Sequence, residues 1–262
     1  MLKSREVRRG TLRAANTVPD PKVEMRPARP GCSVGFLPPA GGFPEVGTFG
    51  ALVRRGNAFF ILSNNHVLAD ENNLRPPAPI FQPSILDDRD FGNHQIASLF
   101  SFATLLRGGP NRVDCAIAHV PNPNLVSNSI LRIGPPSGTV APSVDMPVHK
   151  FGRSSGYTVG SISTFGVNAR MEYDTDIFLF INQIIIRSAT SAPFPEKGDS
   201  GALVVERATR RAVGLLIGRG SDGMSGVANP INEVLQSLRV NSGLSRQRRD
   251  GTPGPRAFSP HS

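Results

Sequence analysis

A chain of 262 residues and 28.0 kDa is long enough to bury a hydrophobic core without disulfides or a structural metal. Its 27 Gly and 24 Pro, with 39% hydrophobic and 19% charged residues, predict a globular chain rich in turns and exclude an all-helical bundle. The formal charge of +9 lies in the ends of the chain, where residues 1–31 carry eight Lys/Arg against three Asp/Glu, and residues 239–262 carry five against one. Because the region between them is neutral, composition implies no basic cleft for nucleic acid.

The start of the chain, MLKSREVRRG, has early charges and no apolar stretch of the kind found in signal peptides. No apolar run reaches the roughly 18 residues that cross a bilayer. We therefore expect a cytoplasmic protein without membrane contact. The two cysteines, Cys32 and Cys115, do not form a disulfide framework and are expected to be buried free thiols.

The predicted elements are mostly short strands, rich in β-branched and aromatic residues and separated by Gly, Pro, Asn or Asp. In chain order these strands are GTFGALVRR (47–55), AFFILS (58–63), HQIASLFSF (94–102), VDCAIAHV (113–120), YTVGSIS (157–163), DIFLFINQIIIRS (176–188), GALVVE (201–206) and AVGLLIG (212–218). One helix is predicted near the end, with Asn229 as its cap and Pro230 at its first position. The pattern favours an all-β fold of packed antiparallel barrels or a sandwich. The loop-like residues 121–147 divide it into two halves, and a cleft between two such halves is a common place for an active site.

The sharpest local motif is Gly198-Asp199-Ser200-Gly201. Flanking glycines let the backbone turn tightly and bring amide N–H groups toward a developing oxyanion. The small neighbours leave the Ser200 hydroxyl open to a substrate. The motif is typical of a nucleophilic serine, although a plain glycine turn has the same composition.

A serine hydroxyl needs a base to remove its proton, and His66 is the best-placed histidine. It follows the apolar run AFFILS and the turn residues Asn64 and Asn65, at the end of a strand. The base in turn needs a shielded carboxylate. Asp114 lies inside the apolar run VDCAIAHV, where an isolated carboxylate would be unfavourable without a partner.

The order His66, Asp114, Ser200, within NNHVL, VDCAIA and GDSGA, resembles that of chymotrypsin/trypsin-fold serine peptidases. The resemblance covers about residues 33–238 and implies two six-stranded antiparallel β-barrels with a cleft between them and a C-terminal helix. The segments GTFGALV, ILSNNHVLAD, QPS and FGRSSGYTVGSI are most similar to intracellular bacterial trypsin-like peptidases and their plant relatives of the narrow-leaf type.

The resemblance also implies a division of the chain. We expect a flexible basic arm over 1–31, a first β-barrel over 32–135, a second barrel with the helix over 136–240, and a disordered basic tail over 241–262. A linker, a regulatory arm or a propeptide would each fit residues 1–31.

Carried over residue by residue, the resemblance makes Ser200 the nucleophile, His66 the general base and then acid, and Asp114 the orienting carboxylate. The backbone N–H groups of Gly198 and Ser200 would form the oxyanion hole. The reaction is then peptide hydrolysis through an acyl-enzyme, without metal or cofactor.

The expected substrate pocket contains Phe194, Ile217, Gly218 and Arg219. Related enzymes of basic specificity carry an aspartate where this chain has Phe194, so a preference for Arg or Lys is not supported. Two preferences remain open, a small or apolar side chain, or an acidic one selected by Arg219. Relatives activated by a new amino terminus insert it beside the residue equivalent to Asp199, but no inserting sequence of the IVGG kind is evident.

Three functions fit the sequence. The first is a serine endopeptidase acting on a protein or peptide, or less favourably an esterase. The second is a latent or inactive trypsin-like module that binds extended peptides by strand pairing while its basic tails engage a regulatory protein. The third is an all-β nucleic-acid binder, which the neutral core disfavours.

Overall fold

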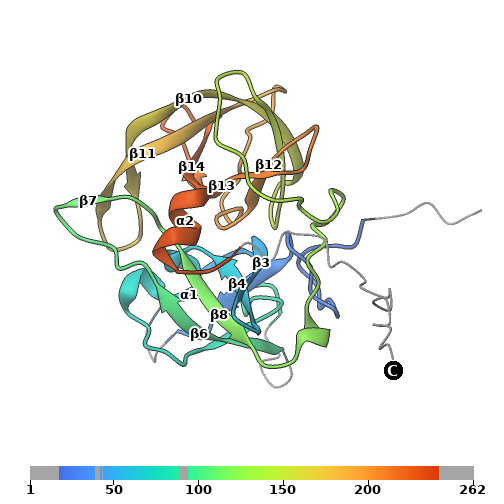
Figure 1. Ribbon diagram of the computed structural model, residues 1–262. Coiled ribbons are helices and arrows are strands. Elements are labelled where there is room, and N and C mark those ends of the chain that lie inside the picture. Colours follow the sequence, from blue (N-terminus) through green and yellow to red (C-terminus); the bar gives the residue numbers. More distant parts are fainter. Residues whose placement is uncertain (1–17, 39–41, 43, 89–93, 242–262) are drawn as a thin grey trace, which may run out of the picture.

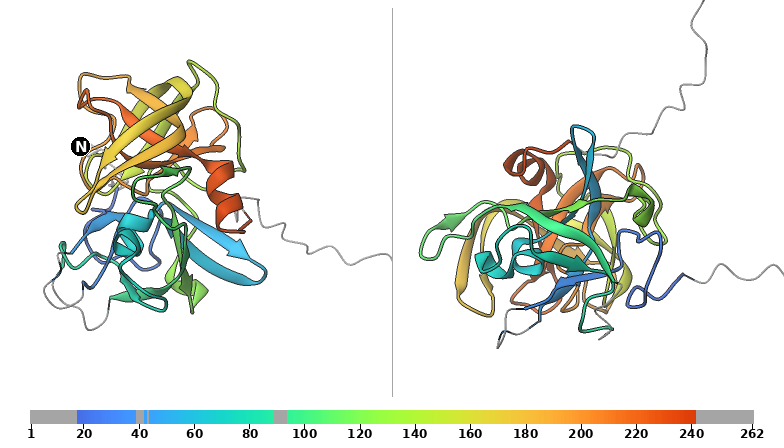
Figure 2. Two further views of the ribbon diagram at one scale, coloured as in Figure 1. Left: turned by 90° about the vertical axis from the view of Figure 1, so that its left-hand side faces the viewer. Right: turned by 90° about the horizontal axis from the view of Figure 1, so that it is seen from below.

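The computed structural model describes residues 18–38, 42, 44–88 and 94–241, and the fold is almost entirely β. The expected basic tail over 241–262 and the first part of the expected arm, residues 1–17, lie outside the described residues, apart from residue 241. The two halves are stacked, with the blue-to-green half below the yellow-to-red half in two of the views (Figures 1 and 2). In the described part of the chain, no helix is both long and apolar enough to span a membrane.

The first half is one antiparallel sheet of seven strands (Figure 1). Its spatial order is β2 (Val46–Thr48), β1 (Ser33–Phe36), β5 (Pro79–Phe81), β6 (Gln95–Phe102), β8 (Ala116–Val120), β4 (Ala58–Ser63) and β3 (Ala51–Arg55). Because the edge strands β2 and β3 are consecutive in the chain and joined by residues 49–50, the sheet must curl back toward itself. The run GTFGALVRR was expected as one strand. It is interrupted at Gly50, whose N–H bonds to the carbonyl of Leu62 (2.9 Å).

The second half is a closed barrel of six strands with a short seventh strand at its edge. The order is β10 (Gly156–Glu172), β9 (Pro147–Gly152), β12 (Leu203–Glu206), β13 (Ala212–Arg219), β14 (Gly226–Pro230), β11 (Ile177–Ser188) and β7 (Pro110–Asn111), and pairing of β10 with β11 closes the ring. The two-residue strand β7 pairs parallel to β11. The two-barrel architecture predicted from the sequence is therefore confirmed, but each half has seven strands rather than six. In the first half the expected strand 47–55 is divided into β2 and β3, and in the second half β7 is added.

Two short helices and two 3-10 turns complete the described elements. They are α1 (Asn65–Leu68), η1 (Asp70–Asn72), η2 (Pro123–Leu125) and α2 (Ile231–Ser237). The predicted C-terminal helix is thus present, but the cap assignment was wrong, since Pro230 is the N-cap residue and Asn229 belongs to β14. The Asn229 side chain is fully buried and bonds to other groups described below.

The two halves share a continuous apolar contact. One buried cluster joins Phe49 and Leu62 of the first half to Leu203 and Leu215 of the second, and it includes Val234 of α2. Burial of apolar area is the main favourable term in folding, so this shared cluster fixes the cleft geometry. Cys32 and Cys115 are both buried and free, as predicted.

Part of the expected amino-terminal arm packs on the first half. Ala28 is fully buried, its N–H bonds to the carbonyl of Leu125 (2.7 Å), and Gly31 N–H bonds to the carbonyl of Phe49 (2.7 Å). Residues 18–31 therefore extend the first half. The physical reason is that these residues supply both an apolar side chain and backbone pairing, which composition alone did not reveal.

Candidate active site

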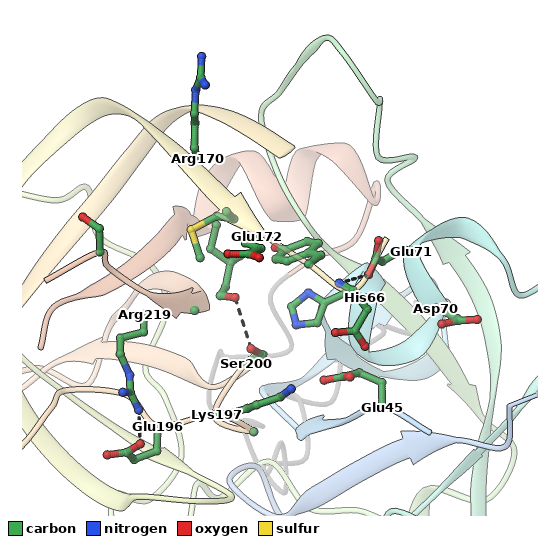
Figure 3. Close-up of a pocket in the computed structure, with 17 residues that line it drawn as sticks. Glu45, His66, Asp70, Glu71, Arg170, Glu172, Glu196, Lys197, Ser200 and Arg219 are labelled. Carbon is green, nitrogen blue, oxygen red and sulfur yellow. Dashed lines mark hydrogen bonds and ion pairs between the residues drawn. The ribbon is translucent and has the colours of Figure 1, made fainter. Parts of the chain in front are cut away.

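His66 lies in α1, a single helical turn that follows β4 after Asn64. The turn is closed by hydrogen bonds from Leu68 N–H to the carbonyl of Asn64 (3.0 Å) and from Ala69 N–H to that of Asn65 (2.6 Å). The His66 side chain is nearly buried and borders a cavity of about 520 Å³ that Ser200 also lines. Figure 3 shows the imidazole and the Ser200 side chain near each other among the residues that line this cavity.

Asp114 is fully buried, and its carboxylate is completely engaged. Oδ1 accepts the backbone N–H of Asn65 (2.6 Å), and Oδ2 accepts a short hydrogen bond from His66 Nδ1 and another from the Tyr173 hydroxyl (2.7 Å). The Asp114 N–H bonds to Asn229 Oδ1 (2.8 Å), which explains why Asn229 does not cap the helix. The several donors hold the Asp114 carboxylate in one orientation.

The Asp114–His66 pair sets the proton affinity of the imidazole. Burial lowers the pKa of His66, but the charge of Asp114 and its hydrogen bond outweigh burial and raise the pKa above its usual value. With Nδ1 donating to Asp114, the neutral ring has Nε2 free to accept a proton. The arrangement is that of a general base held in the correct tautomer.

Ser200 lies in a tight loop between β11 and β12, flanked by two glycines in left-handed conformations. Gly198 has φ +95° and Gly201 has φ +88°, values that other residues rarely adopt. A Cβ on Gly201 would lie only 2.0 Å from Ser63 Oγ, so the first half packs directly on this loop. Both glycines of the motif are therefore required by the backbone as well as by space.

The Ser200 hydroxyl donates to the carbonyl of Ile217 at 3.3 Å (Figure 3). The hydroxyl is thus directed to β13 rather than to the imidazole. Catalytic hydrogen bonds are often poorly aligned in free enzymes and tighten with substrate bound.

Two backbone amides beside Ser200 are available to an oxyanion. Within the described residues, the N–H groups of Gly198 and Ser200 donate to no other group of the chain. Their carbonyls are held by Thr48, whose Oγ1 donates to the Gly198 carbonyl (3.0 Å) and whose N–H donates to that of Ser200 (2.8 Å). Free, oriented N–H groups next to a nucleophile are the requirement for oxyanion stabilisation.

Asp199, which precedes the nucleophile, forms an internal ion pair with Lys150 of β9. Both side chains are fully buried, and Lys150 Nζ lies 2.8 Å from Asp199 Oδ2. Ser155 Oγ (2.5 Å) and the N–H of Ser154 (2.8 Å) also donate to this carboxylate. Burial raises the pKa of Asp199, but Lys150, the N–H of Glu196 and the Ser155 hydroxyl lower it below its usual value, so Asp199 is held in its charged form.

Three of the four expected pocket residues, Ile217, Gly218 and Arg219, line the same cavity as His66 and Ser200. Arg219 does not present a free guanidinium, because it forms an exposed ion pair with Glu196 (Figure 3).

Phe194, the fourth expected pocket residue, is fully buried and does not line the cavity. Its ring is packed between Gly160 and Gly226, and a Cβ on either glycine would lie 2.9 Å from a ring carbon. The Phe194 backbone is fixed at both ends, its N–H by the carbonyl of Met224 (2.9 Å) and its carbonyl by Thr158 Oγ1 (2.8 Å).

Sequence reasoning missed Lys150, Tyr173 and Asn229, which all touch the carboxylates of this site or their backbone. Lys150 stands inside the strand-forming segment PVHKFG, so the argument that identified Asp114, a charge within an apolar strand, would have identified Lys150 as well. Tyr173 lies in the turn between β10 and β11. Nothing in the local sequence shows that this turn reaches the other half.

No protein-family model and no curated protein matches this chain. Solved structures do match. One is titled a glutamic acid specific serine protease that utilizes a novel histidine triad in substrate binding, with 17% identity, a TM-score of 0.57, and coverage of 81% of this chain and 98% of that one. Others are Thermobifida fusca Protease A (14% identity, TM-score 0.54, coverage 81% and 96%) and Cellulomonas bogoriensis chymotrypsin (16% identity, TM-score 0.53, coverage 82% and 98%).

At these identities the likeness concerns the fold. The narrower similarity to intracellular bacterial and plant narrow-leaf-type peptidases stays a prediction. The strand order, the stacked halves and the matched structures agree, and the chain has the two-barrel fold of the chymotrypsin-like serine proteases.

Proposed function

We propose that the chain is a serine endopeptidase that hydrolyses peptide bonds through an acyl-enzyme on Ser200. The observation that carries the proposal is the buried Asp114–His66 hydrogen bond, formed at the cavity that Ser200 lines. The residue types, their burial and the neighbouring free amides fit the requirements of acyl transfer.

In the proposed reaction, His66 Nε2 takes the Ser200 proton while Oγ attacks the scissile carbonyl carbon. The carbonyl oxygen becomes an oxyanion that accepts from the N–H groups of Gly198 and Ser200. The protonated His66 then gives its proton to the leaving amine as the C–N bond breaks. Water then attacks the acyl-enzyme while His66 takes its proton, and His66 returns that proton to Ser200 as the carboxylic acid product leaves. Asp114 stays ionised throughout.

For the primary specificity, we propose a small or apolar substrate side chain rather than an acidic one. Arg219 is paired with Glu196, so a substrate carboxylate would have to compete with Glu196 for the guanidinium. The described cavity lining also carries more acidic than basic side chains, namely Glu45, Asp70, Glu71, Glu172, Asp174 and Glu196 against Arg170, Lys197 and Arg219. Such a field repels acidic side chains.

Covalent labelling tests the proposed activity. A fluorophosphonate probe is expected to label the wild type at Ser200, located by intact mass and peptide mapping, and to leave Ser200→Ala and His66→Ala unlabelled. Ser137→Ala is the matched control, because Ser137 is exposed and lies outside the cavity lining. An adduct on another residue, or equal labelling of His66→Ala, would overturn the assignment of roles.

A peptide library tests the specificity separately. We expect cleavage after small or apolar residues. Cleavage dominated by Glu or Asp, or by Lys or Arg, would contradict the proposed specificity while leaving the activity established.

A latent peptide-binding module is the second candidate. The Ser200–Ile217 hydrogen bond favours it, since the Ser200 hydroxyl donates to a backbone carbonyl instead of to His66. This candidate predicts that extended peptides bind without cleavage and that fluorophosphonate leaves the wild type unmodified. Binding of an uncleaved peptide, measured by isothermal titration, together with an unlabelled wild type would support the module over the peptidase.

A further inference from the structure

The carboxylate oxygen that holds His66 also accepts a second hydrogen bond. The Tyr173 hydroxyl donates to Asp114 Oδ2 at 2.7 Å, on the same oxygen that His66 Nδ1 contacts. The Tyr173 and His66 rings pack against each other, with centroids 4.6 Å apart and planes at 44°. Tyr173 therefore touches both members of the pair that prepares the nucleophile.

Tyr173 is brought to this position by the other half of the molecule. Asp114 and His66 come from the first half, whereas Tyr173 lies in the turn between β10 and β11. On the second-half side, the Tyr173 ring packs on Phe178 and Phe180, with centroids 5.5 Å and 6.0 Å away.

The first half anchors the same turn through Glu71. This nearly buried carboxylate accepts the N–H of Asp174 at 3.1 Å (Figure 3). It also accepts a hydrogen bond from Thr175 Oγ1. Glu71 adopts a left-handed conformation, with φ +49°, which is unfavourable for a residue other than glycine. The buried Glu71 carboxylate therefore holds the two residues that follow Tyr173 in the turn.

The hydroxyl is a permanent donor in this setting. Burial and the charge of Asp114 raise the pKa of Tyr173 well above its usual value, so the proton stays on the phenol at physiological pH. A donor on Oδ2 disperses part of the negative charge that faces the imidazole. It also removes the freedom of the carboxylate to rotate away from His66.

We propose that Tyr173 is a positioning residue of this site, acting through Asp114 to fix the imidazole of His66 and to limit how strongly that imidazole holds a proton. The inference rests on the proposed function, because it gives the Asp114–His66 pair a catalytic purpose. Tyr173 itself takes no part in bond making.

The test uses Tyr173→Phe, which keeps the ring and removes only the hydroxyl. NMR titration of the His66 ring in the free full-length protein is expected to show a higher pKa, because the undispersed charge of Asp114 then favours the imidazolium. The acid limb of the fluorophosphonate labelling rate should move to higher pH by the same amount. The maximal rate at high pH should fall about tenfold, the order expected when one hydrogen bond to a charged group is lost.

Tyr157→Phe is the matched control, since the sequence contains only two tyrosines. The Tyr157 hydroxyl also bonds to a histidine, His149 Nδ1 at 3.0 Å, but has no contact with Asp114. This variant should leave the His66 titration and the labelling rate unchanged. It also leaves Tyr173 as the only tyrosine, so tyrosinate absorbance reports Tyr173 alone. That absorbance should appear only at a pH well above the range in which an ordinary tyrosine ionises.

The outcomes separate this inference from the proposed function. An unchanged His66 pKa in Tyr173→Phe, or tyrosinate formation at the ordinary pH in Tyr157→Phe, would overturn the positioning role. A slower rate with unchanged His66 titration and a reduced free energy of unfolding would assign Tyr173 a merely structural role. If wild-type Ser200 is never labelled, the proposed function fails, while the NMR titration still decides whether Tyr173 controls His66.

Discussion

Lys150 and Asp199 form an ion pair in which neither side chain is exposed, and this pair lies directly behind the nucleophile. The Asp199 carboxylate also accepts the N–H groups of Glu196 (2.9 Å) and Ser154 (2.8 Å), so it fixes both the start of the nucleophile loop and the turn after β9. The position of Ser200 is therefore tied to a charge on a neighbouring strand of the same barrel.

Replacing Lys150 should be strongly destabilising. Lys150→Met keeps an unbranched side chain, one atom shorter, but leaves Asp199 as an unpaired buried charge, which typically costs about 3–5 kcal/mol of stability. We expect urea unfolding to show a loss of this size and fluorophosphonate labelling of Ser200 to fall with it. Lys150→Met combined with Asp199→Asn should regain part of the stability, because no charge is then left unpaired. If the single variant is as stable as the wild type, the pair does not support the loop.

Residues 1–17 should be dispensable for reactivity. The place beside Asp199 that a new amino terminus would take in a cleaved relative is filled here by Lys150 Nζ and Ser155 Oγ. A variant that begins at residue 18 is expected to label at Ser200 at the wild-type rate. Deletion through residue 31 should instead lower the free energy of unfolding, because it removes the fully buried Ala28. A large gain in labelling after the shorter deletion would identify the segment as an inhibitory propeptide.

The labelling rate should depend on pH through His66. Only the neutral imidazole accepts the Ser200 proton, and Asp114 raises the pKa of His66 above its ordinary 6.5. The rate should therefore fall as the pH is lowered, with its half-maximal value above pH 6.5. Asp114→Asn removes the charge that raises the pKa, so the residual rate of this variant should have its half-maximal value at lower pH. A wild-type midpoint below pH 6.5 would contradict the proposed pairing.

The sequence was informative where a local pattern has one physical reading. Runs rich in β-branched and aromatic residues, bounded by turn residues, predicted most strands, and the cost of burying a carboxylate singled out Asp114, two residues before β8. Short elements were missed because two to four residues carry too little periodicity, as in β5 and β7.

The long-range parts of the site were not predictable in the same way. Tyr173 and Asn229 are 59 and 115 residues from Asp114, and their contacts arise only when the second barrel closes against the first. Asn229 followed by Pro230 has the local signature of a helix start, but the Asn229 side chain instead accepts from the Asp114 N–H and donates to Gln183 Oε1. Such contacts are hard to predict from a single sequence, because the residues next to Tyr173 and Asn229 do not indicate which distant residue each will contact.

Gly50 tests how closely the first half must approach the nucleophile loop. A Cβ at this position would lie 2.1 Å from the backbone carbonyl of Gly201, which cannot move without displacing Ser200. Gly50→Ala is expected to lower the free energy of unfolding by about 1–3 kcal/mol through overpacking. It should also slow labelling of Ser200 by about a hundredfold, the order for a displacement near 1 Å at a reacting group.

Gly109→Ala is the control for Gly50→Ala, because the added methyl group would meet only Leu106 Cβ at an ordinary 3.8 Å. Its stability and labelling should equal those of the wild type. Comparing the rates under conditions where both variants are fully folded separates displacement of Ser200 from simple unfolding. If folded Gly50→Ala reacts at the wild-type rate, the loop tolerates the shift and the contact between the halves does not position the nucleophile.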